Sequence, residues 1–319
     1  MSLWAEIAIG TAGTIILLGA GLILFTAWNA RRARTNIPPD GRFANVAGAR
    51  LHYLDIGAGP PIVMIHGLGG QLRNFTFALS ERLARDHRLV IVDRPGSGYS
   101  TFTGEGERGL AAQADIIVRL LDRLGIEDPL VVGHSLGGAV ALSMALRHPG
   151  RLGGLALLAP LTQHMDTVPE VFAALGLTSP LLRALVGWML AAPVGRLQQR
   201  RSCAALFGPE ATPDDFEVKA GAALSLTPSA FRSASLDVAA CRSEMAPMAL
   251  RYGELALPVG ILFAGQDRIL PYEDHGPPAA RAIAGAELRT IRGGHMFPLT
   301  QADLTADWIR ERARAAGHR

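Results

Sequence analysis

Short apolar runs without any polar residue recur along the chain and have the composition of buried β-strands. They cover residues 62–65, 89–92, 130–132 and 155–158, and strands of this kind lie inside parallel sheets. Between the second and third run, residues 112–124 place apolar side chains at helical spacing. The alternation of strands and helices predicts an α/β fold whose mostly parallel central sheet is flanked by helices on both faces.

This alternation stops between residues 161 and 255. Helix-like segments follow one another there with few strand-like runs, and prolines interrupt them at Pro169, Pro180, Pro193, Pro209, Pro213, Pro228 and Pro247. An apolar run at 259–264 then restarts the sheet, and 288–291 is expected to be its last strand. We therefore expect residues 161–255 to form a helical cap over the sheet, inserted between two parts of the sheet domain at 42–160 and 256–319.

An apolar segment without charged residues, residues 7–28, precedes the sheet domain. As a helix it would be about 33 Å long, and the hydrocarbon core of a bilayer is roughly 30 Å thick. Trp4 and Trp28 bracket the segment, as aromatic residues do at membrane interfaces. The pattern predicts a transmembrane anchor over residues 1–34.

The residues that follow the predicted anchor have two distinct patterns. Residues 35–41 contain Pro38 and Pro39 and are expected to form a short, stiff linker. Apolar and polar residues then alternate over 42–46 and 50–55, which predicts a β-hairpin with one buried face.

A cleaved signal peptide is the alternative interpretation of the N-terminus, and it would make the protein periplasmic or secreted. A signal peptide has basic residues before its apolar run. Here Glu6 precedes the run, and Arg31, Arg32 and Arg34 follow it. This arrangement favours a retained anchor, and the positive-inside rule places the domain that follows on the cytoplasmic side of the membrane.

The strongest chemical signal is the sequence Gly133-His134-Ser135-Leu136-Gly137, a Gly-x-Ser-x-Gly pattern. It lies between a predicted strand and a predicted helix, which is the context of a nucleophile elbow. Gly133 and Gly137 are expected to leave room where a side chain would collide with the neighbouring elements. Ser135 would then stand exposed at the carboxyl edge of the sheet.

Four further motifs occur in order around this elbow: His66-Gly-Leu-Gly-Gly, Asp93-Arg-Pro-Gly-Ser-Gly-Tyr-Ser, Gly265-Gln-Asp-Arg and Gly293-Gly-His295. With these motifs the chain resembles the α/β-hydrolase family from about Arg42 to Arg312. The resemblance implies that the segment from Asp93 is architectural and that His66 is a structural residue beneath the loop that it begins.

The same resemblance implies a role for each residue of a catalytic triad. Ser135 would be the nucleophile, His295 the general base and Asp267 the acid that orients it, with Asp166 as the reserve candidate. The backbone amides of Leu68 and Leu136 would form the oxyanion hole, and Gly67 would let the substrate approach them.

The nucleophile limits the possible reactions. Haloalkane dehalogenases and epoxide hydrolases of this architecture need an aspartate where Ser135 stands. A serine favours an acyl-enzyme route that needs no cofactor or metal. The surplus of apolar residues in the cap suits either a tunnel for the acyl or alkyl chain of a hydrophobic ester or contact with the membrane surface next to the anchor. The order of anchor, linker and capped hydrolase is similar to that of membrane-bound monoacylglycerol lipases.

Several alternatives use the same residues. A carbon–carbon bond hydrolase, a cofactor-free perhydrolase and an amidase would share the triad, because the difference between them lies in the cap. A membrane-tethered binding protein without activity is the alternative from another class of function. All predicted triad residues and elbow glycines are present, and this argues against it.

Composition adds limits of its own. The chain has 319 residues, 49% of them hydrophobic, and can bury one large core beside a small appendage. Its net charge of +3 comes mainly from scattered arginines, with Lys219 the only lysine, so we expect no nucleic-acid partner. Cys203 and Cys241 are too few for a disulfide framework or a metal site, and either one bridge or two free thiols would fit.

Overall fold

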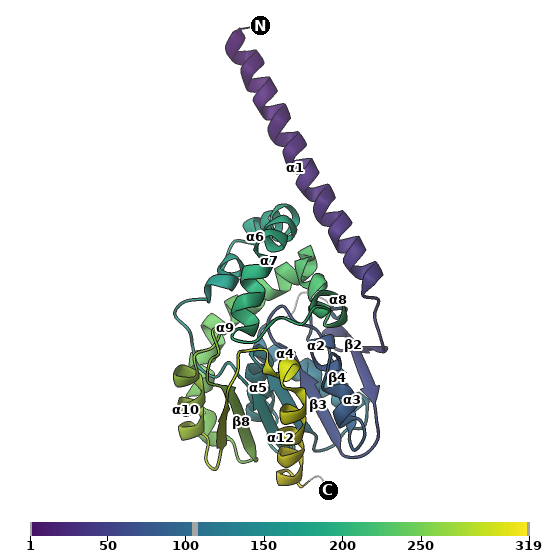
Figure 1. Ribbon diagram of the computed structural model, residues 1–319, viewed down its shortest axis with the longest axis vertical. Coiled ribbons are helices and arrows are strands. Elements are labelled where there is room, and N and C mark those ends of the chain that lie inside the picture. Colours follow the sequence, from purple (N-terminus) through teal and green to yellow (C-terminus); the bar gives the residue numbers. More distant parts are fainter. Residues whose placement is uncertain (1, 104–107, 318–319) are drawn as a thin grey trace.

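The computed structural model describes residues 2–103 and 108–317 and confirms the predicted α/β fold (Figure 1). Within this part of the chain, a nine-stranded sheet has the order β1-β2-β4-β3-β6-β7-β8-β9, and β5 pairs with β2. Neighbouring strands from β4 to β9 are parallel, whereas β2 is antiparallel to its neighbours. The strands are β1 (Arg42–Val46), β2 (Ala49–Ile56), β3 (Pro61–Ile65), β4 (Arg88–Val92), β5 (Thr101–Phe102), β6 (Leu130–His134), β7 (Gly154–Leu158), β8 (Val259–Ala264) and β9 (Glu287–Ile291).

Helices cover both faces of the sheet. On one face α12 packs against α3, β6 and β7, and on the other α4 and α5 pack against each other (Figure 1). Their buried residues recur at helical spacing, which is why the apolar pattern of 112–124 could be read from the sequence. These helices are α2 (Arg73–Thr76), α3 (Ser80–Leu83), α4 (Leu110–Arg123), α5 (Leu136–Arg147), α10 (Tyr272–Ala282), α11 (Phe297–Thr300) and α12 (Ala302–Ala315).

The register of the parallel strands brings the sequence motifs to one edge of the sheet. Ile65 is aligned with Gly133, and His134 is aligned with Leu158. Ala264 is aligned in turn with Ile291. The loops that follow β3, β6, β8 and β9 therefore all leave the sheet at its carboxyl edge, where ligands bind in open α/β sheets.

A group of helices between β7 and β8 lies over this edge (Figure 1). The elements between β7 and β8 are all helices, as expected for a helical cap. The cap consists of η1 (Glu170–Leu175), α6 (Pro180–Met189), α7 (Ala191–Phe207), α8 (Phe216–Lys219), η2 (Ala222–Leu226) and α9 (Pro228–Ala249), and the short η3 (Tyr252–Glu254) leads back to the sheet.

The N-terminal apolar segment is part of one long helix, α1 (Leu3–Asn36), which projects away from the domain (Figure 1). By length and composition α1 can cross a membrane. The helix includes Thr35 and Asn36, so it extends into the expected linker. It ends before Ile37, because the residue that precedes a proline, here Pro38, disfavours the helical conformation. One face near its C-terminal end is buried against the cap at Thr26, Asn29, Ala30 and Ala33.

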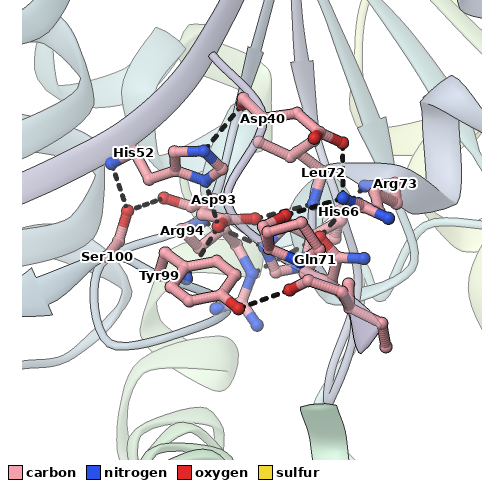
Figure 2. A network of polar contacts seen from close by, with 12 residues as sticks. Asp40, His52, His66, Gln71, Leu72, Arg73, Asp93, Arg94, Tyr99 and Ser100 are labelled. Atoms are coloured by element: carbon pink, nitrogen blue, oxygen red, sulfur yellow. Dashed lines mark hydrogen bonds and ion pairs between the residues drawn. The ribbon is translucent and has the colours of Figure 1, made fainter. Parts of the chain in front are cut away.

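The residues that follow α1 are fixed to the sheet domain (Figure 2). Tyr99 donates a hydrogen bond to the carbonyl of Ile37, and Arg73 donates one of 2.7 Å to the carbonyl of Pro38. The buried carboxylate of Asp93 holds this region together, since it accepts hydrogen bonds from His52 Nδ1 and from the amide of Tyr99. The predicted linker is therefore held against the sheet domain by hydrogen bonds. Asp93 and Tyr99, which contribute to them, belong to the predicted architectural segment.

Candidate active site

Ser135 occupies a sharp turn between β6 and α5. Its φ is 55° and its ψ is −122°, a conformation that L-residues rarely adopt and that is typical of strained functional positions. A β-carbon on Gly133 would lie 2.5 Å from the carbonyl oxygen of Gly137, and one on Gly137 would overlap the carbonyl oxygen of Ile65. Only glycine fits at both positions, so the sequence pattern of the elbow has a direct steric cause.

The loop after β3 lies directly against Ser135. A β-carbon on Gly67 would be 2.9 Å from Ser135 Cβ and 3.3 Å from Oγ. The amide of Leu68 donates to no residue that the structure describes, and Leu136 is the first residue of α5, so its N–H has no acceptor within that helix. The structure thus brings together Ser135, Gly67, Leu68 and Leu136, with two backbone donors available beside the serine.

Asp267 and His295 come from the loops after β8 and β9 and form a buried pair. Asp267 Oδ2 lies 2.6 Å from His295 Nδ1, and Oδ1 accepts hydrogen bonds of 2.8 and 2.9 Å from the amides of Ile269 and Leu270. Burial raises the pKa of Asp267, but the charge and hydrogen bond of His295 and the two amides outweigh it and hold this pKa below its usual value. An ionised carboxylate accepts a hydrogen bond, so the pair fits the tautomer of His295 that carries its proton on Nδ1, with Nε2 as the other ring nitrogen.

The two glycines before His295 are required by their surroundings. Gly293 has a φ of +134°, and a β-carbon on Gly294 would overlap the carbonyl oxygen of Gly208 at the end of α7. Glu210, also from the cap, accepts a hydrogen bond of 2.8 Å from the amide of Gly294. The cap therefore fixes the loop that carries the histidine, a role of Glu210 that no sequence motif had indicated.

His134 connects the elbow to the histidine loop. Its ring lies 4.9 Å from the ring of His295, centroid to centroid, and its Nε2 lies 3.1 Å from the carbonyl oxygen of that residue. Burial and the nearby charge of His295 lower the pKa of His134 to about 3, so its imidazole is neutral.

Ser135 Oγ has no hydrogen-bond partner among the described residues. In structures without substrate, the hydrogen bond between a catalytic hydroxyl and its base is often long, and it tightens only when a substrate is bound.

A pocket opens beside Ser135 beneath the cap, and most of its lining is apolar. Gln163 and Arg242 are its polar exceptions. Asp166, the reserve candidate for the acid, has a side chain that is 99% exposed and pairs with His164, so the structure does not bring it to the serine. Cys241 lines the pocket and, like Cys203, is a free thiol. The remaining lining residues are Leu68, Leu136, Leu161, Met165, Val168, Pro169, Phe172, Val238, Met245, Ile269 and Leu270.

A buried polar network lies directly under the loop of Gly67 (Figure 2). His66 Nε2 accepts a hydrogen bond from the amide of Arg94, and Nδ1 lies 2.9 Å from the carbonyl oxygen of Gly67. Burial and the charge of Arg94 lower the pKa of His66 well below its usual value, which fits a structural, neutral histidine. The Arg94 side chain, buried with Gln113 and Asp237, was not recognised in the sequence because its partners lie far along the chain.

Comparison with known proteins agrees with this fold and site. A family model described as the alpha/beta hydrolase fold matches residues 60–302, and the chain belongs to that family. The 2-hydroxymuconate semialdehyde hydrolase of Pseudomonas sp. (strain CF600) is 37% identical over 145 residues, which are 43% of this chain and 51% of that protein. The chain spans between about a third and a half of the length of the first curated relatives that it matches.

Two solved structures share the fold. An esterase from Thermogutta terrifontis has a TM-score of 0.71 and 23% sequence identity, over 86% of this chain and 99% of its own. A membrane phospholipase A described as a bacterial virulence factor has a TM-score of 0.70 and 18% identity, over 98% of this chain and 97% of its own.

Proposed function

We propose that this protein is a membrane-anchored serine hydrolase that cleaves carboxylic esters with hydrophobic acyl groups. The observation that carries the proposal is the position of Ser135, on a strained elbow in an apolar pocket, beneath a cap that also fixes the loop of the buried His295–Asp267 pair. A nucleophile, a base with its orienting acid, and two backbone donors are the parts that acyl transfer requires.

The proposed reaction proceeds through an acyl-enzyme. His295 Nε2 takes the hydroxyl proton of Ser135 as Oγ bonds to the ester carbonyl carbon, and the amides of Leu68 and Leu136 hold the oxyanion. The bond to the alcohol oxygen then breaks, and His295 gives its proton to that leaving group. Water attacks the acyl-enzyme in the same way, with His295 as the base, which releases the carboxylic acid and returns the proton to Ser135. Asp267 stays ionised throughout and stabilises the imidazolium.

The substrate class follows from the pocket and from α1. Side chains such as Met165, Phe172 and Met245 leave few polar partners for an acyl chain, so a hydrocarbon tail gains most by binding there. An ester that also partitions into membranes, such as a monoacylglycerol, would meet the enzyme where α1 anchors it. The arginines at 31, 32 and 34 favour the cytoplasmic side for the domain.

Carbon–carbon bond hydrolysis is a second candidate, favoured by one observation. Arg242 contributes a guanidinium to a pocket whose lining is mostly apolar, and such a group suits a substrate with a carboxylate. The similarity to a 2-hydroxymuconate semialdehyde hydrolase over 145 residues supports this candidate. In that case the same triad would act on a ketone rather than on an ester.

The first experiment is hydrolysis of p-nitrophenyl esters from acetate to palmitate by the full chain in detergent, with Ser135→Ala as the matched variant. We expect an optimum at medium or long chains and no turnover by the variant. Folded wild type that turns over no ester but does react with a fluorophosphonate probe would move carbon–carbon substrates to the front. Folded protein that neither hydrolyses esters nor reacts with the probe would favour a binding protein.

The anchor has its own test, independent of activity. Membranes from cells that express the full chain are washed at alkaline pH, and the N-terminal sequence of the retained protein is determined. A retained protein that begins at the first residues supports the anchor. Release into the wash, or an N-terminus beyond residue 28, would support a cleaved signal.

A further inference from the structure

The cap carries an apolar surface that no residue in 2–103 or 108–317 covers. It is formed by α6 and the first turns of α7, where Leu181 is 77% exposed and Leu197 is 84% exposed. Between residues 179 and 195 the only charged side chain is Arg183, and it is buried with hydrogen bonds to Ser235 Oγ and to the carbonyl of Leu177. A soluble protein rarely exposes so many large apolar side chains together. The other exposed residues of this surface are Leu182, Leu185, Trp188, Leu190 and Val194.

Helices α6 and α7, which carry this apolar surface, pack against α1 (Figure 1). The side chain of Met189, at the end of α6, lies 3.3 Å from where a β-carbon on Gly19 would be. Gly19 is near the middle of the apolar segment and precedes Trp28 by about 14 Å along the helix. The headgroup layer is only about 5–8 Å thick on each side. If α1 crosses the bilayer, the tip of α6 reaches the hydrocarbon of the same leaflet.

The contact between α1 and the cap is built to hold one orientation. Asn29 Oδ1 accepts hydrogen bonds of 3.2 and 3.1 Å from Arg196 on α7. Ala33 and Ile37 are buried with Leu224 of η2, and the residues after Ile37 are clamped to the sheet domain. Since α1 is one continuous helix, its angle to the cap also sets the angle of the cap to the membrane.

A groove at the base of this surface matches the charge of lipid headgroups. It lies between α1, α6 and the start of α9 and is lined by Arg31, Arg34, Trp188 and Ser229 among others. Neither arginine forms an ion pair with a carboxylate in the part of the chain that the structure describes. Arginine is well suited to phosphate, and tryptophan is enriched at membrane interfaces.

We infer that α6 and the start of α7 dock into the same lipid leaflet that α1 enters, with phospholipid phosphates beside Arg31 and Arg34. The inference rests on the proposed membrane anchor and adds a second, monotopic contact to it. A second copy of the chain is the alternative occupant of the apolar surface, and the test below distinguishes it from lipid. The docked cap holds the pocket of Ser135 at the membrane surface, where it can take lipid esters without their passage through water.

The test places an environment-sensitive NBD label at single cysteines in full-length protein reconstituted into phosphatidylcholine–phosphatidylglycerol vesicles. The background is Cys203→Ala and Cys241→Ala, checked for turnover of a soluble p-nitrophenyl ester. Leu185→Cys reports on the cap surface and Leu24→Cys, 69% exposed, on α1. Leu250→Cys is the matched control, because it is 89% exposed but follows the far end of α9. Vesicles with nitroxide-labelled acyl chains provide the quencher.

We expect nitroxide lipids to quench the label at 24 and at 185 at least threefold more than the label at 250. Quenching at 24 but not at 185 would overturn the inference and leave the anchor intact. Absence of quenching at both 24 and 185 would overturn the anchor and the inference with it. A blue-shifted label at 185 that nitroxide lipids do not quench would show that a second copy covers the surface, which also overturns the inference.

A second variant reads out function. Leu181→Glu with Leu185→Glu adds charge to the surface without touching the pocket. We expect turnover of a soluble p-nitrophenyl ester to stay within twofold of wild type and turnover of a monoacylglycerol held in vesicles to fall at least fivefold. Equal turnover of the vesicle substrate by both proteins would contradict the docking.

Discussion

Arg94 and Asp237 form a buried ion pair that joins the loop after β4 to helix α9 of the cap, with Nη2 and Oδ2 3.0 Å apart. The same guanidinium donates hydrogen bonds to the carbonyls of His66 and Gly67, at 2.9 and 3.1 Å. Gln113 bonds to both partners of the pair. A single arginine therefore connects the cap to the loop that carries Leu68, whose amide is one of the two proposed oxyanion donors.

Asp237→Ala tests this connection. The substitution leaves the charge of Arg94 buried without its partner, which typically destabilises a protein by about 3–5 kcal/mol. We expect a loss of that order in the free energy of unfolding, measured with denaturant. We also expect kcat for p-nitrophenyl esters to fall more than KM changes, because the loop of Gly67 loses its fixed position.

The matched control for Asp237→Ala is Glu254→Ala, which removes the partner of Arg251 at the surface. Exposed pairs contribute little, so this variant should unfold like wild type. If Asp237→Ala kept the stability and kcat of wild type, the ion pair would have no role in positioning the loop.

Gly67→Ala tests the close approach of the loop to the serine. The added methyl group would lie 2.9 Å from Ser135 Cβ, closer than such carbons normally come, so the loop or the serine must move. We expect kcat/KM for esters to fall at least a hundredfold while the melting temperature changes by only a few degrees. Gly253→Ala is the control, since its nearest neighbour is the carbonyl oxygen of Ala282 at 3.8 Å. Full activity of Gly67→Ala would show that the serine does not need this space.

Much of the architecture was accessible from the sequence because its causes are local. The apolar runs carry their structural reason with them, and the α/β fold that they predicted was confirmed. The glycines around Ser135 are explained by the contacts that a β-carbon would make there, and the catalytic role of the serine stays a prediction. The strand β5 was missed, since two residues, Thr101 and Phe102, contain no periodicity. Helix α1 runs to Asn36 and so continues past the predicted anchor boundary at residue 34. Ala33 and Ile37 are buried there against Leu224 of the cap, a long-range contact that the sequence could not show.

The residues that support the site were harder to predict. Glu210 reaches the loop of His295 from 84 positions away, and Asp237 reaches Arg94 from 143 positions away. Neither has a neighbouring motif, and only the tertiary fold brings them to their partners. The apolar residues of the cap could be counted in the sequence, but whether they faced the pocket or the outside required the structure.

Asp267→Asn tests the proposed acid, and Asp166→Asn is its control. Asparagine at 267 would present an amide to His295 Nδ1 and favour the wrong tautomer, which in Ser-His-Asp enzymes lowers kcat about 10⁴-fold. We expect a loss of that order at neutral pH for Asp267→Asn and wild-type kcat for Asp166→Asn. The opposite pattern would make Asp166 the acid and the pair with His295 merely structural.

His275 gives the protein a stability that depends on pH. It is buried, and its Nδ1 accepts hydrogen bonds of 3.3 Å from the amides of Thr162 and Gln163, so protonation would break both bonds. Burial lowers its pKa to about 4. In the unfolded chain the imidazole has its usual pKa near 6.5 and binds a proton that the folded protein does not bind.

The contribution of His275 to stability is therefore complete above about pH 6.5 and is lost progressively between pH 6.5 and 4, below which both states are protonated. The loss is on the order of 3 kcal/mol over this interval. His275→Asn keeps an acceptor near Nδ1 but cannot take up the proton. We expect urea unfolding to show that, from pH 6.5 to 4, the free energy of unfolding falls more steeply for wild type than for His275→Asn. The difference between the two slopes should correspond to close to one additional proton taken up on unfolding. Parallel pH profiles for the two proteins would mean that His275 is already free to titrate in the folded state.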